Sequence, residues 1–379
     1  MKKVTILSLH LGFGGIEKSI ASLANILSGK YDVEIVCTYK VLDKPAFKIN
    51  DNVVIKYLIN DKPNKEEFRN SISEHKFIET FKQGLKGIKL LRLKKKTMIN
   101  YIKNCDSDVI VSTRDIFNDY LGVYGKKDVL KIGWEHNHYH DNMRYAENVV
   151  RCSSKLDYLV LVSNSLEAFY RGRLRNTNCK TVFIPNVVEN IPKDNEISKL
   201  ERKKLISVGR LSKEKGYMDL VKIFNIISHD YPDWTLDIIG DGDEKKKIVK
   251  YIEDNNLQDK VLLHGFRNKD YIYDRLGKAS IYLMTSYTES FGIVLLEAMS
   301  MGLPCIAFSS AEGANEIINS GSNGYLIKNR NFSAYIKKVE DLIEDFETRK
   351  KVGLQGRRTV KKYSSEVVGK KWLELIEKK

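Results

Sequence analysis

Short apolar runs alternate with amphipathic segments along most of the 379-residue chain. The runs are bounded by turn-forming residues, and their continuous apolar character is typical of strands covered on both faces. In the first half they span residues 3–9, 31–39, 52–58, 108–113, 129–134, 158–163 and 181–186, and in the second half residues 204–210, 234–240, 260–266, 279–285, 304–308 and 324–328. Because helical patterns separate them, the chain is predicted to form βαβ units and parallel sheets.

The runs fall into two series, and the chain length also favours two domains. Polar and charged residues cluster from Ile184 to Leu205, where we expect the boundary. The prediction is a first doubly wound α/β domain over residues 1–188 and a second over residues 189–363. A helix is predicted over residues 364–379, and its apolar spacing alone would let it pack on either domain.

The composition narrows the class of partner. The chain has 64 Lys and Arg against 49 Asp and Glu, a net charge of +15. Nucleic acid, an anionic membrane surface and a phosphorylated substrate all fit this charge. Five widely spaced cysteines without a C-x-x-C pair indicate free thiols in a reducing compartment.

The chain start resembles a signal peptide, but His10 interrupts its apolar run, so we predict a first strand there. No apolar run approaches the ~20 residues that span a bilayer.

One segment concentrates the positive charge. Residues 82–103 carry eight Lys or Arg, and Phe81, Leu85, Ile88 and Leu91 follow helical spacing beside them. A basic amphipathic helix of this kind can lie on an anionic membrane surface. The alternative is that the apolar stripe packs on its own domain and the lysines are solvated.

Ligands of parallel sheets bind beyond the carboxyl ends of the strands, so the loops there are the first candidates for a site. In the stretch "TSYTESFGIVLLEAMSMGLPCIAF", Glu289 lies in a loop between a strand and a short helix, where the amides of Ser290 and Gly292 would face a ligand. Glu297 lies about one and a half turns into that helix, on a mostly apolar segment. A carboxylate there needs a partner, such as a pair of ribose hydroxyls. The alternative is a capping acid followed by a solvated glutamate.

Two other loops have the residues of a phosphate site. Arg210 and Lys215 lie between a strand and a helix, where two cations would hold a diphosphate unless they are solvated surface charges. Gly14 and Gly15 follow the first strand and would let backbone approach a phosphate or sugar closely. The G-x-G-x-x-G pattern is not completed, since Glu17 occupies the third glycine position, which counts against a nicotinamide dehydrogenase.

Three alternating histidines, His136, His138 and His140, suggest a metal site, but such a site would also need other ligands and an appropriate geometry. His136 directly follows a strand and is the best placed of the three to enter a cleft. A structural hydrogen-bonding role is the alternative.

Taken together, these motifs resemble the retaining glycosyltransferases of family 4, which have the GT-B fold. The resemblance rests on the Gly14–Gly15 turn, on "EHN" at residues 135–137, on "SVGRLSKEKG", "IIGDGDE" and "HGF", and above all on "ESFGIVLLEAMSMGLPCIAF" with its glutamates at 289 and 297. It implies two Rossmann-like domains facing a cleft, with the C-terminal helix crossing back to the first domain.

The resemblance also implies roles for the matching residues. Arg210 and Lys215, with Gly14 and Gly15, would hold the donor diphosphate, and Glu297 the ribose hydroxyls. The donor sugar would be held by Glu289, Ser290, Phe291, Gly292 and Ile293. His136 would lie near the reacting carbon, and Phe266 and Arg267 near the base. The catalytic set is therefore His136, Glu289, Arg210 and Lys215, with no cofactor and no metal.

The leading hypothesis is an enzyme that moves a hexose or N-acetylhexosamine from a nucleoside diphosphate, expected to be UDP, to a lipid-linked or polymeric cell-surface glycan. It would be cytoplasmic or peripheral on the inner face of the cell membrane, with residues 82–103 as a candidate contact and no nucleic-acid partner. The alternatives are a nucleotide-sugar epimerase of similar fold and a non-catalytic binder of an anionic polymer.

Overall fold

The computed structural model describes residues 1–189 and 191–378, without the side chain of Glu66. Asn190 and Lys379, which belong to the predicted second domain and terminal helix, lie outside the described residues. The chain divides into two compact units. Unit 1 comprises Met1–Ile184 and Gly369–Lys379, and unit 2 comprises Pro185–Val368.

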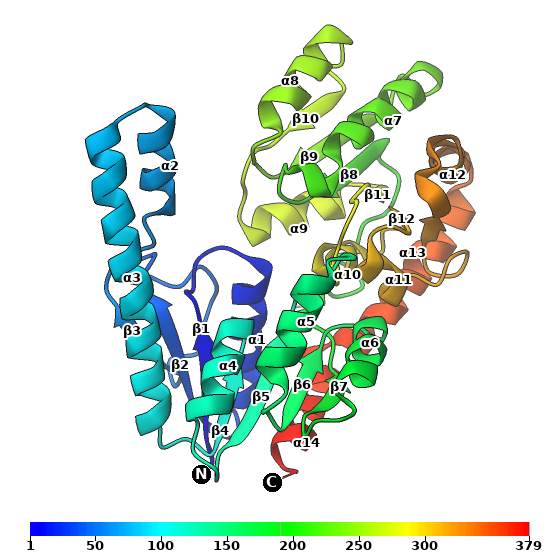
Figure 1. Ribbon diagram of the computed structural model, residues 1–379. Coiled ribbons are helices and arrows are strands. Elements are labelled where there is room, and N and C mark those ends of the chain that lie inside the picture. Colours follow the sequence, from blue (N-terminus) through cyan, green and yellow to red (C-terminus); the bar gives the residue numbers. More distant parts are fainter. Residues whose placement is uncertain (190, 379) are drawn as a thin grey trace. The chain divides into compact units, whose positions relative to one another are not determined.

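Unit 1 is built on a parallel sheet of seven strands in the order β3-β2-β1-β4-β5-β6-β7 (Figure 1). The strands are β1 (Lys3–Ser8), β2 (Asp32–Tyr39), β3 (Val54–Ile59), β4 (Val109–Ser112), β5 (Leu130–Glu135), β6 (Tyr158–Leu161) and β7 (Lys180–Phe183). Its helices are α1 (Gly15–Leu27), α2 (Lys65–Ser73), α3 (Phe77–Asn104), α4 (Asp115–Tyr124), α5 (Met143–Ser153) and α6 (Asn164–Leu174). The central strands are apolar on both faces, because helices cover both.

Unit 2 repeats the arrangement with a parallel sheet of six strands in the order β10-β9-β8-β11-β12-β13. The strands are β8 (Lys204–Val208), β9 (Thr235–Ile239), β10 (Val261–Leu263), β11 (Ile281–Met284), β12 (Cys305–Phe308) and β13 (Tyr325–Ile327). The α-helices are α7 (Tyr217–Asp230), α8 (Lys245–Asp254), α9 (Lys269–Gly277), α10 (Ile293–Ser300), α11 (Glu312–Ile317), α12 (Phe332–Glu344) and α13 (Phe346–Val360), with short 3₁₀ turns η1 (Lys213–Lys215), η2 (Lys328–Arg330) and η3 (Lys361–Tyr363).

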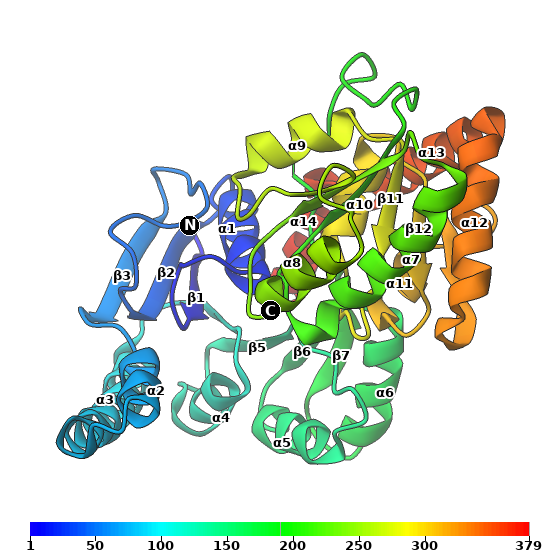
Figure 2. The same cartoon turned by 90° about the horizontal axis from the view of Figure 1, so that it is seen from above.

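The strand order of unit 2 fixes where its helices lie. Right-handed crossovers place α7 and α8 on one face of the sheet and α9 and α10 on the other (Figure 2). A buried cluster that includes Leu220, Ile223, Ile248 and Tyr335 joins α7, α8 and α12 to the strands. Both sheets reverse their strand order between neighbouring central strands, which is where parallel α/β sheets bind ligands.

The last helix, α14 (Ser365–Ile376), passes from unit 2 into unit 1, since the division falls between Val368 and Gly369. Within unit 1 its Trp372 is 1% exposed and meets the ring of Trp134 with centroids 5.0 Å apart.

All five cysteines are buried and unpaired, as the spacing indicated. Within the described residues no helix combines the length and apolar character needed to cross a bilayer.

Candidate active site

In unit 2 the loop after β8 presents the two predicted cations differently. Arg210 is 71% exposed, and its Nη2 lies 3.0 Å from Glu214 Oε1. Lys215 ends η1 and is mostly buried, with its Nζ 2.5 Å from Glu289 Oε2. The structure therefore joins Lys215 and Glu289, two predicted site residues that lie 74 positions apart in the chain. Arg210 lies in the same loop as Lys215 but pairs elsewhere.

Gly216 makes this meeting of loops possible. It caps α7 with φ 66° and ψ 26°, a left-handed conformation that favours glycine. A Cβ at this position would lie 2.1 Å from the carbonyl oxygen of Thr285, at the end of β11. The hydroxyl of Thr285 in turn donates to the Gly216 carbonyl at 2.9 Å. The start of α7 thus sits directly on the end of β11.

The loop after β11 is held by unit 2 itself. Gly292 caps α10 with φ 88°, so Ile293 begins the helix. Phe291 is 2% exposed and packs against the ring of Tyr363, so only its backbone is available to a ligand. The Gly313 N–H donates to the Glu289 carbonyl at 2.7 Å. Ser290, half-buried, lies between these fixed points.

Glu297 lies on α10 and is 6% exposed. Burial raises the pKa of the Tyr273 phenol, and the charge of Glu297 adds to this rise.

Phe266 and Arg267 follow β10, and both are exposed. The guanidinium of Arg267 lies 5.0 Å from the ring centroid of Tyr271 on α9. In the sheet order β10 is two positions from β8, so these residues lie along the same carboxyl edge as Arg210 but not beside it.

Arg330 is a residue that the sequence reasoning missed. Its Nη1 donates to the Ser286 carbonyl and its Nη2 to the Thr285 carbonyl, each at 3.0 Å. It also forms an ion pair with Asp219 on α7 and lies 3.6 Å from the ring centroid of Tyr287. A single arginine therefore fastens the β11 loop to α7. Its sequence surroundings, "IKNRN", form no motif that predicts this.

In unit 1 the two glycines between β1 and α1 differ. A Cβ on Gly14 would lie 2.0 Å from Oε2 of the buried Glu17, so a larger residue there would have to displace this carboxylate. A Cβ on Gly15 would meet no described heavy atom within 4 Å. Glu17 is held by Arg114, whose Nη2 is 3.3 Å from Glu17 Oε1. Arg114, two residues beyond the end of β4, is a second residue that sequence reasoning missed.

His136 follows β5 and is 7% exposed. Its ring lies against Trp134, with centroids 4.2 Å apart, and no described residue hydrogen-bonds its Nε2. Burial, with a smaller contribution from the charge of Arg114, lowers the pKa of His136 to about 3. The imidazole is therefore neutral near pH 7.

Glu135, which precedes it, is also buried. Burial raises the pKa of the Glu135 carboxyl to about 7, against the lowering effect of hydrogen bonds from the Asn137 N–H at 2.7 Å and the Tyr145 hydroxyl at 3.0 Å.

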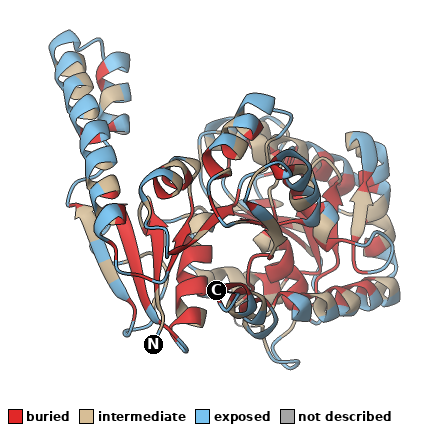
Figure 3. Ribbon diagram, turned by 60° about the horizontal axis from the view of Figure 1, so that its bottom comes forward, coloured by how far each residue is buried: buried red, intermediate tan, exposed pale blue. Residues whose placement is uncertain are grey.

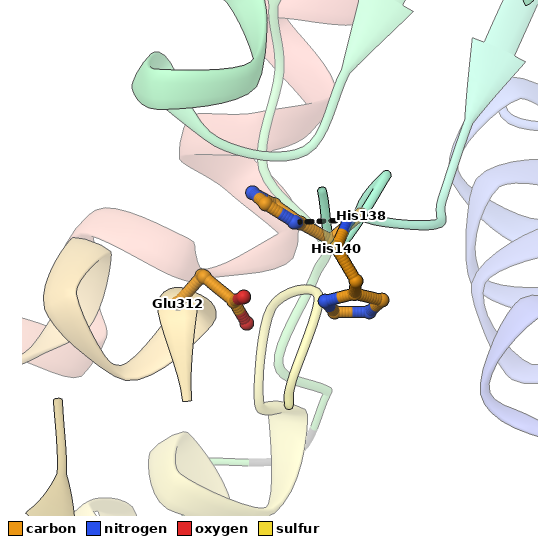
Figure 4. Close-up of side chains that lie close together, drawn as sticks. All are labelled: His138, His140 and Glu312. Carbon is orange, nitrogen blue, oxygen red and sulfur yellow. Dashed lines mark hydrogen bonds between the residues drawn. The ribbon is translucent and has the colours of Figure 1, made fainter. Parts of the chain in front are cut away.

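The other two histidines of the alternating pattern contact each other. The His140 N–H donates to His138 Nδ1 at 3.0 Å, and the ring centroids are 4.8 Å apart (Figure 4). Nδ1 of His138 thus accepts a hydrogen bond from the backbone. Glu312, also drawn in Figure 4, belongs to unit 2, where it accepts from the Glu289 N–H at 3.3 Å.

Comparison with known proteins shows which class of protein this chain resembles. Residues 188–359 match the family described as "Glycosyl transferases group 1". The chain is 26% identical over 385 residues to an uncharacterized glycosyltransferase of Haemophilus influenzae, covering 99% of this chain and 100% of that protein. It is 24% identical over 368 residues, 92% of each chain, to the N-acetylgalactosamine-N,N'-diacetylbacillosaminyl-diphospho-undecaprenol 4-alpha-N-acetylgalactosaminyltransferase of Campylobacter jejuni. A mutant of S. aureus TarM solved with fondaparinux, alpha-GlcNAc-glycerol and UDP has a TM-score of 0.78 at 16% identity, over 99% of this chain and 100% of that one.

Unit 2 therefore carries a glycosyl transferases group 1 domain, and the two parallel sheets form the GT-B fold. The chain is a glycosyltransferase that uses a nucleotide sugar.

Proposed function

We propose that the protein is a retaining hexosyltransferase of family 4. It moves a hexose or N-acetylhexosamine from UDP to a lipid-linked or polymeric cell-surface glycan, and it works in the cytoplasm at the inner face of the membrane. Relatives support this acceptor class, since the Campylobacter jejuni protein is named for a diphospho-undecaprenol acceptor. The choice of UDP is supported by the TarM mutant, whose crystal structure is a complex with UDP.

The observation that carries the proposal is the contact of Lys215 with Glu289 at the starts of α7 and α10. Transfer breaks the bond from the anomeric carbon to the diphosphate oxygen, so negative charge builds on the leaving diphosphate. Lys215, Arg210 and the amide-rich helix starts stabilise that charge. Because Glu289 and Lys215 are in contact, the glutamate can accept a hydrogen bond from a sugar hydroxyl while the lysine forms an ion pair with the phosphate.

The acceptor hydroxyl attacks the anomeric carbon on the face that the diphosphate leaves, and its proton passes to the departing phosphate oxygen. No metal is needed in this scheme, because the two cations supply the positive charge. His136 does not act as an acid near neutral pH, since burial lowers its pKa to about 3. We assign it a contact near the reacting carbon.

The test compares Lys215→Ala with Lys203→Ala. Lys203 also forms an ion pair in unit 2, 2.8 Å from Asp233, but it precedes β8 while Lys215 follows it. Calorimetry should find UDP binding weakened by ~1.5–3 kcal/mol for Lys215→Ala and unchanged for Lys203→Ala.

A panel of nucleotide sugars, with hydrolysis and transfer followed by mass spectrometry, names the donor in the same experiment. Equal loss in both variants would reject the assignment of Lys215. Epimerisation of the donor without transfer to any acceptor would show that the protein is an epimerase, which contradicts the proposed reaction.

A further inference from the structure

The α2–α3 hairpin of unit 1 exposes a continuous apolar stripe. The exposed fractions are 84% for Phe77, 68% for Phe81, 53% for Leu85 and 50% for Ile88. Steps of four, four and three residues place these side chains on one face of α3. Ile78, at 77% exposed, and Leu91, at 64%, extend the stripe at its two ends. Soluble surfaces rarely leave such a run uncovered without a binding role.

Packing within the hairpin explains why the stripe is left open. The face of α3 toward α2 is a different one: the Asn64 amide donates to the Gln83 carbonyl at 2.7 Å, and Thr80 meets Ser71 at 3.1 Å. Further along, Leu90 and Met98 are buried against unit 1. The alternative that the stripe packs on its own domain is therefore wrong, since the buried apolar residues of α3 are others.

Basic residues flank the stripe in register. Lys82, Lys86 and Lys89 each follow a stripe residue by one position, which sets them in a parallel row about 100° around the helix. Between Phe77 and Asn104 there are eight Lys or Arg and one acidic residue, Glu79. A second copy of this helix laid on the stripe would bring two strongly positive rows together, so self-association is disfavoured and an anionic surface is favoured.

The hairpin is also well placed within its unit. It rises beyond the carboxyl edge of the unit 1 sheet (Figure 1). Gly14 and Gly15 follow β1 at this edge, and His136 follows β5. Most of it is exposed, in contrast to the central strands of the unit 1 sheet (Figure 3).

We infer that the α3 stripe inserts into the headgroup region of an anionic lipid bilayer, with Phe77, Phe81, Leu85 and Ile88 as the inserted side chains and the lysine row on the headgroups. Insertion, and not charge alone, holds the protein there. Interfacial helices of this composition bury their apolar face ~5–10 Å into the boundary between headgroups and acyl chains. The inference adds a partner surface to the proposed function, but vesicle binding tests it without any sugar donor or acceptor.

The test uses the full chain and vesicles of phosphatidylcholine with or without phosphatidylglycerol. The variant Phe81→Ser/Leu85→Ser/Ile88→Ser should bind mixed vesicles roughly tenfold more weakly or worse. The matched control is Ile226→Ser on α7, a side chain with the same 50% exposure as Ile88 but outside the hairpin. The variant Lys82→Gln/Lys86→Gln/Lys89→Gln should lose the preference for phosphatidylglycerol.

The depth of insertion is measured with the variant Phe81→Trp and brominated lipids, which quench the fluorescence of a tryptophan inside the bilayer. The three native tryptophans are at most 5% exposed and should contribute little quenching. Quenching of Phe81→Trp, but not of Ile226→Trp, supports insertion.

Two results overturn the inference: unchanged vesicle binding by the serine variant, or a dimer in sedimentation that the serine variant abolishes while vesicles bind nothing. Transfer to a water-soluble acceptor should persist in the serine variant, so loss of vesicle binding and failure of the proposed reaction remain distinguishable.

Discussion

At the scale of single residues, the ion pair between Lys215 and Glu289 determines how much positive charge the candidate site offers to a ligand. Their side chains are 23% and 15% exposed, so the pair is partly shielded from solvent. In the ligand-free protein Glu289 already neutralises the lysine that the proposal gives to the diphosphate. The glutamate therefore opposes the binding of a bare anion and favours one that also offers it a hydroxyl group.

Removing the charge of Glu289 should consequently strengthen binding of UDP while it weakens transfer. We expect Glu289→Gln to improve UDP affinity by roughly 1 kcal/mol, since Lys215 is released, and to lower kcat. Glu214→Gln is the control, because it releases the exposed Arg210, whose pairing in solvent is worth little.

Calorimetry with UDP and steady-state transfer give the two readings. Weaker UDP binding by Glu289→Gln would contradict this account. It would mean that the carboxylate itself holds the nucleotide, or that the loop depends on it.

At the scale of elements, the sheets could be predicted from the sequence because buried parallel strands are continuously apolar. Each of the thirteen predicted runs overlaps one strand of the structure. The periodicity of α3 predicted a helix but could not say which face is buried, because two of its faces are apolar and only the packing of α2 and the sheet distinguishes them. Arg330 and Arg114 escaped prediction for a related reason. Each acts through contacts with residues far away in sequence.

The junction of α7 with β11 depends on Gly216. Two variants can separate the cost of a left-handed backbone at a residue with a Cβ from the cost of the contact that this Cβ would make. Gly216→Ala should destabilise the protein by roughly 2–4 kcal/mol, because a left-handed φ and a contact with the Thr285 carbonyl both oppose a Cβ. Gly321→Ala is the matched control, since its φ is 85° but a Cβ there meets nothing within 4 Å. It should cost about 1 kcal/mol.

Urea denaturation measures both variants. Equal losses would show that backbone conformation alone accounts for the glycine. UDP binding should fall only in Gly216→Ala, because the adjacent Lys215 shifts with the turn.

On the scale of the whole molecule, the chain folds as two units that share one helix. Residues 365–368 of α14 belong to unit 2, and the rest of the helix belongs to unit 1. The amphipathic pattern of this helix was visible in the sequence. Its spacing did not assign it to a unit, because spacing alone does not identify the surface on which Trp372 packs, and only the family resemblance implied the first domain.

Trp372→Ala should lower the stability of unit 1 by ~3–5 kcal/mol, the usual cost of removing a buried aromatic side chain. Hydrogen exchange followed by mass spectrometry should find protection lost in the peptides around Trp134 and His136 and kept in β8 and β11. An equal loss in both units would mean that they unfold as one cooperative body.

The buried cysteines provide an internal label for such opening events. Cys37, Cys105, Cys152 and Cys179 belong to unit 1, and Cys305 belongs to unit 2. Burial raises the pKa of the Cys37 and Cys179 thiols to about 12, and that of Cys152 to about 11, so few thiolates are available to an alkylating reagent while the chain is folded. Each opened unit therefore adds its own number of alkyl groups. A pulse of reagent gives a mass increase of one label when unit 2 opens alone and of four labels when unit 1 opens alone. Because the five cysteines are unevenly distributed, the number of labels identifies the unit that was unfolded.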